Sequence, residues 1–303
     1  MELYNINSQR IYSANPENSV NSGSDKKDCA EKFYITLMPK IQFVSDLHVD
    51  FYSHSAKASK ILKFYLNTEA DYLVVAGDVS NSQTVTVRTF TELSEMYKKV
   101  FWVPGNHDLV ISYPSARSIN NSWAYIDGIC NDLPENVHKL NGNLLNITEN
   151  TTIGGCMGYC DFGYAKRMLK IKDKDMWEKW SYWYDSVYIG LNRAAGVNLW
   201  ECEQEKMLSS LQLKPDIMVT HFMPSYSLVE KCWASDLCTT FFTFNGDEML
   251  KKFGKQGGKI WAYGHTHGKT FTKKCKVKLV CNPFGYPNEA KSNTIKESTF
   301  EIE

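Results

Sequence analysis

Five short apolar runs, rich in β-branched and aromatic residues, are spaced along the chain from about residue 41 onward. Runs of this kind are typical of strands that a parallel sheet buries on both faces. Each run ends in a polar cluster, and the five segments read IQFVSDLH, YLVVAGD, VFWVPGNHD, DIMVTH and KIWAYGHTH. Because ligands bind where the carboxyl ends of parallel strands open, we expect the five clusters to form one site.

From Ile41 onward, the pattern alternates between predicted strands and predicted helices. SAKASKILKFYLN and TVRTFTELSEMYKK carry apolar residues at helical spacing and predict crossover helices between the first three strands. From about Leu140, the segments KLNGNLLNI and TTIGGCMGY indicate a second group of strands. The chain is therefore expected to have an α/β fold.

Residues 1–38 differ from the rest because they are rich in Asn and Ser and show little periodicity. We expect them to form a mobile tail, with a docked N-terminal strand or helix as the alternative. Residues 39–303 are expected to form one domain with an insertion, or cap, over about residues 160–205.

An aromatic segment, DMWEKWSYWYDSVYIGLN, marks this insertion and predicts a helix with Trp177, Trp180 and Tyr184 on one face. Trp183 and Tyr182 point elsewhere, and a helix that is aromatic on more than one face needs more than one partner surface. The segment is either the core of the insertion, which we favour, or a cap that presents aromatic rings to a substrate. THFMPSYSLVEKCW, which includes the end of the fourth run, is a second candidate wall of a substrate pocket.

Composition narrows the class of protein. The chain has 34 Lys+Arg and 34 Asp+Glu, so no overall field recruits nucleic acid or a membrane surface. Nine cysteines without a C-x-x-C pair favour reduced thiols over disulfides or structural zinc. The sequence has no apolar run of membrane-spanning length, and its N-terminus does not resemble a signal peptide. We expect a cytoplasmic enzyme without a membrane partner; the sequence indicates no protein partner.

The polar clusters carry carboxylate, imidazole and carboxamide groups, and five of the seven histidines lie in them. A lone D-x-H or GD is ordinary cap or turn chemistry, whereas GNHD is a better signal and GHTH is the strongest alone; five such clusters in one chain predict a pair of metal ions. His265 and His267 are two positions apart, and on extended backbone such side chains point the same way. Mixed nitrogen and oxygen ligation suits Mn, Fe, Zn, Ni or Co better than Ca or Mg, and we expect two divalent transition-metal ions, with Mn first.

The order D-x-H, GD, GNHD, H and GH-x-H resembles the calcineurin-like metallophosphoesterase superfamily over about residues 40–289. CNPFGYPNE, near the C-terminus, is similar to the NP-x-GYP-x-E ending of bacterial phosphoesterases of that superfamily. The resemblance implies a two-sheet β-sandwich flanked by helices. It also implies two metal sites with one shared carboxylate: the first site holds Asp46, His48 and His267, the second holds Asn106, His221 and His265, and Asp78 bridges both.

The resemblance also implies the chemistry. His107 would be the acid near the leaving group, Asp108 would orient it, and Asn106 and His107 would contact the substrate. A metal-bridging hydroxide would attack the phosphoester. His54 and His138 are expected to be non-catalytic.

The substrate stays open. We expect phosphomonoesters or phosphodiesters of small or nucleotide-like molecules. The alternatives are a protein phosphatase acting on phosphopeptides, as a delivered bacterial effector for example, and an inactive scaffold of the same fold. The Asp-Arg-Gly segment of the superfamily's protein Ser/Thr phosphatases is absent after Gly77-Asp78. Arg117, Arg167 and Arg193 are further candidates for phosphate contact.

Overall fold

The computed structural model describes residues 38–52, 57–289 and 292–303. Apart from its last position, the expected N-terminal tail lies outside the described residues, and so does His54.

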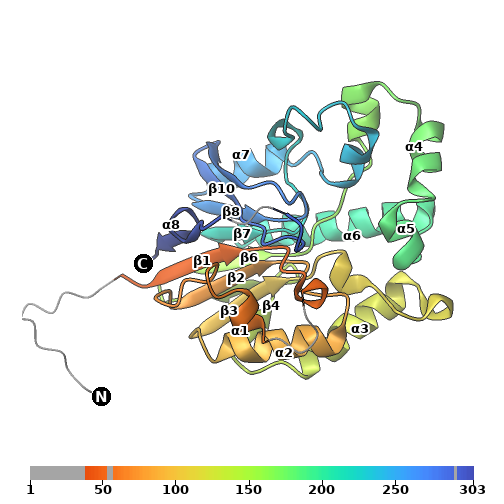
Figure 1. Ribbon diagram of the computed structural model, residues 1–303. Coiled ribbons are helices and arrows are strands. Elements are labelled where there is room, and N and C mark those ends of the chain that lie inside the picture. Colours follow the sequence, from red (N-terminus) through yellow and green to blue (C-terminus); the bar gives the residue numbers. More distant parts are fainter. Residues whose placement is uncertain (1–37, 53–56, 290–291) are drawn as a thin grey trace, which may run out of the picture. The chain divides into compact units, whose positions relative to one another are not determined.

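A first sheet contains five strands in the order β11-β1-β2-β3-β4 (Figure 1). Neighbours from β1 to β4 run parallel, whereas β11 pairs antiparallel with β1. The strands are β1 (Lys40–Val44), β2 (Tyr72–Ala76), β3 (Lys99–Val103), β4 (Val137–Lys139) and β11 (Thr299–Glu301). The first three predicted runs are therefore adjacent strands whose carboxyl ends lie side by side.

A second sheet contains six strands in the order β5-β6-β7-β8-β10-β9. Its inner strands β6, β7, β8 and β10 are parallel, and β5 and β9 pair antiparallel at the edges. The strands are β5 (Leu144–Asn146), β6 (Thr152–Gly155), β7 (Ile217–Val219), β8 (Ile260–Tyr263), β9 (Thr270–Lys274) and β10 (Val277–Cys281). The expected second group of strands thus lies in the second sheet, although its first residue, Lys139, ends β4 of the first.

The two sheets pack face to face around an apolar core, which is mostly aliphatic but also contains Phe43, Tyr72 and Phe101. On β2, Tyr72, Val74 and Ala76 face this inner core, while Leu73 and Val75 face the outer core. Side chains of β7, β8 and β10 fill the inner core from the other sheet. This alternation with both faces buried explains why the strands read as unbroken apolar runs in the sequence.

Helices cover the outer faces of the two sheets (Figure 1). On the first sheet, Phe90 of α2 packs on Trp102 of β3, with ring centroids 5.0 Å apart. The helices are α1 (Ala58–Ile61), α2 (Gln83–Ser94), α3 (Ile119–Asn131), α4 (Asp173–Trp180), α5 (Tyr184–Tyr188), α6 (Arg193–Gln212), α7 (Asp247–Lys255) and α8 (Ile295–Ser298). This is the expected helix-flanked β-sandwich.

The first predicted crossover helix is much shorter than expected. Within the described part of that segment, residues 57–67, only α1 is α-helical, and the chain leaves the helix at Leu62. Tyr65 then donates a hydrogen bond from its hydroxyl to the carbonyl of Asn282, and its own carbonyl accepts one from Gln42 Nε2 at 2.9 Å. These buried contacts with β1 and the end of β10 replace the helical hydrogen bonds that the sequence pattern predicts.

The aromatic insertion contains two helices where the pattern predicts one. The chain breaks between α4 and α5, because Trp183 adopts an extended conformation with φ −72° and ψ 151°. In that conformation its ring packs on Phe241, with centroids 4.9 Å apart. Trp180 is buried and donates its indole N–H to the carbonyl of Leu191 at 3.0 Å. Trp180 is therefore a core residue of the insertion, as we favoured.

Among the described residues, no helix combines the length and the apolar character that crossing a membrane requires. The eight cysteines in the described part of the chain are free thiols.

Candidate metal centre

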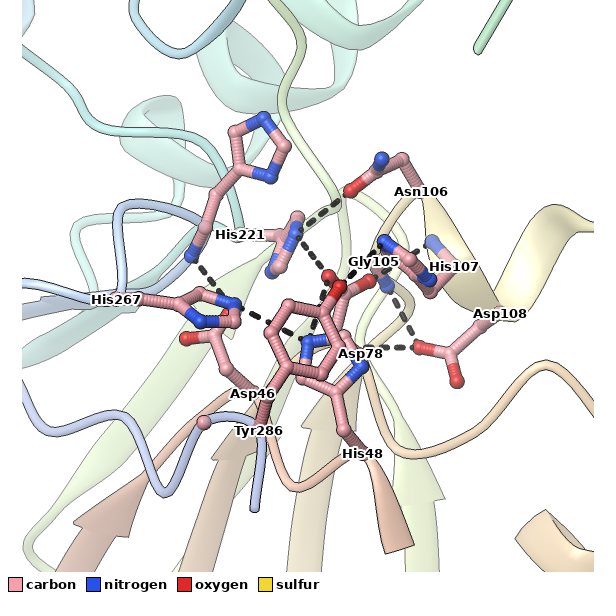
Figure 2. Close-up of polar contacts among 12 residues, drawn as sticks. Asp46, His48, Asp78, Gly105, Asn106, His107, Asp108, His221, His267 and Tyr286 are labelled. Atoms are coloured by element: carbon pink, nitrogen blue, oxygen red, sulfur yellow. Dashed lines mark hydrogen bonds and ion pairs between the residues drawn. The ribbon is translucent and has the colours of Figure 1, made fainter. Parts of the chain in front are cut away.

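The five polar clusters meet at the carboxyl ends of β1, β2, β3, β7 and β8 (Figure 2). Backbone hydrogen bonds tie the loops together: Asp46 N donates to Gly77 O at 2.9 Å, and His48 N donates to Asp78 O at 3.0 Å. Gly264 N donates to His221 O at 2.9 Å in the second sheet. The structure therefore brings the clusters of both sheets into one site, as the sequence predicted.

Five of the seven candidate ligands have a left-handed backbone conformation. Their φ values are 50° for Asp46, 41° for His48, 57° for Asp78, 69° for His265 and 51° for His267. Each such non-glycine conformation costs on the order of 1–3 kcal/mol and is most common at functional sites. The expectation of extended backbone at His265 and His267 is therefore wrong, and the two imidazoles belong to different groups of ligands.

The first group contains Asp46, His48 and His267. His48 Nε2 lies 3.1 Å from His267 Nε2, which in turn lies 3.5 Å from Asp46 Oδ1. Asp46 Oδ2 is buried and has no hydrogen-bond partner among the described residues. Burying an unpartnered carboxylate oxygen is costly, and a cation at this position would remove that cost.

The second group contains Asp78, His221 and His265. His221 Nδ1 donates to the carbonyl of Ala76 at 2.8 Å, so the Nε2 atom faces the site. That Nε2 atom lies 3.3 Å from Asp78 Oδ2 and 3.1 Å from Asn106 Oδ1. Asn106 thereby joins the second group with its carbonyl oxygen.

Asp78 belongs to both sides of the site. Its Oδ1 atom accepts a hydrogen bond from His107 N at 2.8 Å. Its Oδ2 atom lies 3.7 Å from His48 Nε2 and 3.3 Å from His221 Nε2. A carboxylate in this position has the lone pairs required to contact two cations at once.

The spacing of these groups fits a divalent metal ion. Ligands about 2.0–2.2 Å from an ion lie about 2.8–3.6 Å from one another in a tetrahedral or octahedral shell. The separations among the nitrogen and oxygen atoms of Asp46, His48, His267, Asp78, His221 and Asn106 given above, 3.1–3.7 Å, fall close to that range. Neutral imidazole and carboxylate donors are also the mixed set that transition metals prefer.

Burial and charge set the protonation states of the metal-free site. Burial lowers the pKa of His48 and of His265 well below the usual value, which keeps both imidazoles neutral. Burial raises the pKa of Asp78, but the neighbouring imidazoles, His221 first, hold it well below its usual range. Burial lowers the pKa of His221, but Asp78 and Asp46 outweigh it and raise this pKa to about 9. A bound ion would displace the His221 proton.

Asp185 fixes the orientation of the Asn106 amide. Asn106 Nδ2 donates to Asp185 Oδ1 at 2.8 Å, and Tyr159 donates its hydroxyl to Asp185 Oδ2 at 2.6 Å. Because the amide nitrogen is held by Asp185, the carbonyl oxygen is turned toward His221. Asp185 belongs to α5 of the insertion, and sequence reasoning missed it because its partner lies 79 residues away.

Three side chains hold the ring of His107. Its Nδ1 atom lies 2.9 Å from Asn81 Oδ1 and 3.1 Å from the hydroxyl of Tyr184. Its Nε2 atom lies 3.3 Å from the hydroxyl of Tyr286. The Tyr184 ring stacks on the imidazole, with centroids 4.3 Å apart. The aromatic insertion therefore also contributes a side chain, Tyr184, to the surroundings of His107.

Asp108 does not hold the His107 ring, so the expected orienting contact is wrong. Its two carboxylate oxygens instead accept hydrogen bonds from backbone N–H groups of Asp78, Val79, Ser80 and Gly105, at 2.8–3.2 Å (Figure 2). Asn106 has right-handed helical φ and ψ values, and His107–Leu109 form a 3-10 turn. In that turn Asp108 faces the backbone of the loop after β2 and fixes the position of Asp78.

Glu289 is a further residue that supports the first group. Its carboxylate oxygens lie 2.9 and 3.0 Å from His267 Nδ1, so His267 carries its proton on Nδ1 and presents Nε2 to the site. Glu289 is the final residue of CNPFGYPNE, the motif whose resemblance was already visible in the sequence.

The three candidate arginines make contacts elsewhere. Arg117 donates to the carbonyls of Ile111 and Val187, Arg167 pairs with Asp161 at 3.3 Å, and Arg193 stacks over Trp177. His138 lies on β4 beside Phe101, with ring centroids 5.5 Å apart, and the described contacts do not link it to the site.

Comparisons with known proteins agree with this architecture. Residues 39–269 match the family model described as calcineurin-like phosphoesterase. An uncharacterised protein of Acanthamoeba polyphaga mimivirus is 25% identical over 271 residues, covering 82% of this chain and 92% of that protein. The acyl-carrier-protein phosphodiesterase PptH of Mycobacterium tuberculosis is 34% identical over 97 residues, covering 31% of this chain and 29% of that protein.

One solved structure extends the likeness to the fold. The crystal structure of the phosphopantetheinyl hydrolase PptH from Mycobacterium tuberculosis has a TM-score of 0.66 and 17% sequence identity, and the match covers 82% of this chain and 90% of that chain. The family is dinuclear and metal-dependent, and the two ligand groups joined by Asp78 match that pattern. The family model matches most of the chain, and the fold and the ligand groups agree with it. The chain therefore belongs to the calcineurin-like phosphoesterase family.

Proposed function

We propose that this protein is a dinuclear metal-dependent hydrolase of phosphomonoesters or phosphodiesters. The observation that carries the proposal is the Asp78 carboxylate, whose Oδ2 atom lies between His48 Nε2 and His221 Nε2 at 3.7 and 3.3 Å. One ion would be held by Asp46, His48 and His267, the other by Asn106, His221 and His265, with Asp78 shared. Every candidate ligand of the family pattern is present, which argues against an inactive scaffold.

The bound ions would neutralise phosphoryl charge and make a water molecule nucleophilic near neutral pH. The residues around them would supply the rest of the chemistry. His107 would contact the phosphoryl group and protonate the leaving oxygen, with its ring held by Asn81, Tyr184 and Tyr286. Asn106 would bind both an ion and the substrate. His107 also lies near His48 and Asp78, but both of its ring nitrogens already have partners, which supports an acid role over a ligand role.

We favour a small organic phosphoester as the substrate. The site lies beside a cavity of about 330 Å³, which is at the lower end of the range of about 300–1,000 Å³ for small-molecule sites. The similar protein PptH is named as a phosphodiesterase, so diesters belong in any substrate screen together with monoesters. Phosphopeptides enter the same screen as the competing substrate class.

The test is a phosphoester screen on metal-depleted protein reconstituted separately with Mn, Fe, Zn, Ni and Co. We expect turnover only with added metal and two ions per chain in the active form, with Mn effective. Asp78→Asn should lose metal and turnover while the fold persists by circular dichroism. Asp127→Asn, a change of the same kind at a 70% exposed side chain, is the control. Full activity in chelator-treated protein shown to contain no metal would overturn the proposal.

A further inference from the structure

A cavity of about 330 Å³ opens next to the second ligand group. Trp183, at the start of α5, forms one wall, and Met223 and Leu228, from the loop after β7, form another. Both segments that the sequence suggested as pocket walls, the aromatic insertion and THFMPSYSLVEKCW, therefore line the same space.

The cavity shares walls with the candidate metal centre. Phe242 lines the cavity, and its ring stacks on the imidazole of His265, with centroids 4.6 Å apart and planes inclined by 32°. Thr266, which also lines the cavity, lies between His265 and His267 in the chain. A phosphoester whose phosphoryl group lies on the candidate ligands would therefore have its organic group within reach of the cavity.

The interior of the cavity is apolar and aromatic. Trp183 packs on Phe242, with ring centroids 5.6 Å apart, and Met223 is buried. Trp233 also lines the cavity although 58% of its side chain is exposed. Large aromatic side chains left accessible around a concave surface are typical of a site that binds an apolar partner.

The charged groups of the cavity are acidic. Glu230 and Asp236 are exposed and line it, and no lysine or arginine is found among the lining residues that the structure describes. The two carboxylates on the cavity wall would oppose an organic group that carries negative charge. The size of the cavity suits one or two rings and is small for an extended peptide.

We propose that this cavity binds the organic group of the substrate ester and selects an uncharged, largely apolar group over an anionic one. This proposal rests on the proposed phosphoesterase function and adds the substrate class to it. It also predicts that Glu230 and Trp233 determine specificity without taking part in metal binding.

The experiment compares three aryl phosphates with leaving groups of comparable acidity on the metal-loaded full chain: phenyl, 2-naphthyl and 4-carboxyphenyl phosphate. We expect kcat/KM to rise from phenyl to 2-naphthyl phosphate, and to fall by about tenfold or more for the carboxylate ester, because like charges oppose each other in the cavity. Trp233→Ala should remove the preference for the naphthyl ester and leave the metal content at two ions per chain.

A charge-reversal variant tests the role of Glu230 more specifically. Glu230→Lys should raise kcat/KM for 4-carboxyphenyl phosphate relative to phenyl phosphate, whereas Glu205→Lys, the same change at an exposed position of α6 outside the cavity, should leave that ratio unchanged. The cavity proposal is overturned if Glu230→Lys changes kcat/KM equally for both esters. It is also overturned if phosphopeptides are cleaved faster than every aryl ester and Trp233→Ala does not affect their cleavage. In both cases the phosphoesterase function stands. If no ester is cleaved by metal-loaded protein, the proposed function itself fails.

Discussion

At the scale of single residues, the partners of His107 and Asp108 define two separate tasks. Asn81 and two tyrosine hydroxyls surround the His107 ring, while Asp108 binds backbone N–H groups of the loop that carries Asp78. We propose His107 as the residue that acts on a substrate, whereas Asp108 keeps a candidate bridging carboxylate in position. The short sequence GNHD therefore combines a candidate ligand, a candidate acid and a supporting residue.

We predict that His107→Ala keeps both metal ions but slows hydrolysis by about 10²–10⁴ on alkyl phosphoesters, because a general acid is lost. The loss should be far smaller on nitrophenyl esters, whose leaving group needs no proton. Steady-state kinetics on both esters, together with metal analysis, measure this. His265→Ala is the contrasting variant and should deplete a metal and impair both esters alike. Metal loss in His107→Ala would identify His107 as a ligand.

At the scale of elements, the two helices of the insertion connect the aromatic core to the chemistry. α4 ends at the buried Trp180, and α5 begins at Tyr184, which stacks on His107. Asp185, the next residue, fixes the amide of Asn106. Because the chain breaks between the two helices, one segment can supply both a packed core and a support for the site.

We predict that Asp185→Asn lowers metal affinity or turnover by about 10–100-fold, as is typical for residues that orient a metal ligand. Asn106 and Tyr159 donate to different carboxylate oxygens of Asp185. In an asparagine, an NH2 group replaces one of these oxygens, so one of the two donors would face another donor. Metal affinity measured by competition with a chelating dye tests this. Asp175→Asn, at an exposed position of α4, is the control. Unchanged metal affinity together with lower thermal stability would indicate that Asp185 is structural only.

A second prediction for an element concerns the attachment of α6 to the second sheet. Glu203 is buried, accepts a hydrogen bond from Gly158 N at 2.9 Å and pairs with Lys206 Nζ at 2.6 Å. Glu203→Ala leaves that buried backbone donor without its acceptor, whereas the partly exposed Lys206 can turn to solvent. The change should lower the free energy of unfolding by about 1–3 kcal/mol. Urea denaturation measures the change. Glu201→Ala, at an exposed position of the same helix, should stay within about 0.5 kcal/mol of the parent, and an equally small effect at Glu203 would contradict the assignment.

At the scale of the whole domain, the candidate ligands come from both sheets. Asp46, His48, Asp78 and Asn106 follow strands of the first sheet, whereas His221, His265 and His267 follow strands of the second. Bound ions would therefore join the two sheets at one edge of the sandwich, in addition to the apolar core between them.

Metal removal should accordingly destabilise the whole domain. At a free metal concentration about 100 times the dissociation constant, binding contributes about 2.7 kcal/mol per site, so chelation should lower the melting temperature measurably. Calorimetry with and without chelator tests this, and Asp46→Asn should reduce the difference because it weakens one site. A melting temperature that does not respond to metal in the parent protein would contradict ligation from both sheets.

The sequence by itself predicted the parallel strands and one polar site at their ends, because apolar runs that are buried on both faces and the polar clusters that follow them are local patterns. Its resemblance to the family implied the two-sheet sandwich and the seven candidate ligands. The tertiary structure alone revealed the partners of His107, the different role of Asp108, and the supporting residues Tyr184 and Asp185. The left-handed backbone at five ligands, the short α1 and the break before α5 also depend on contacts between segments far apart in the chain. Local patterns do not encode such contacts, because their energy arises only once the two sheets and the insertion have packed together.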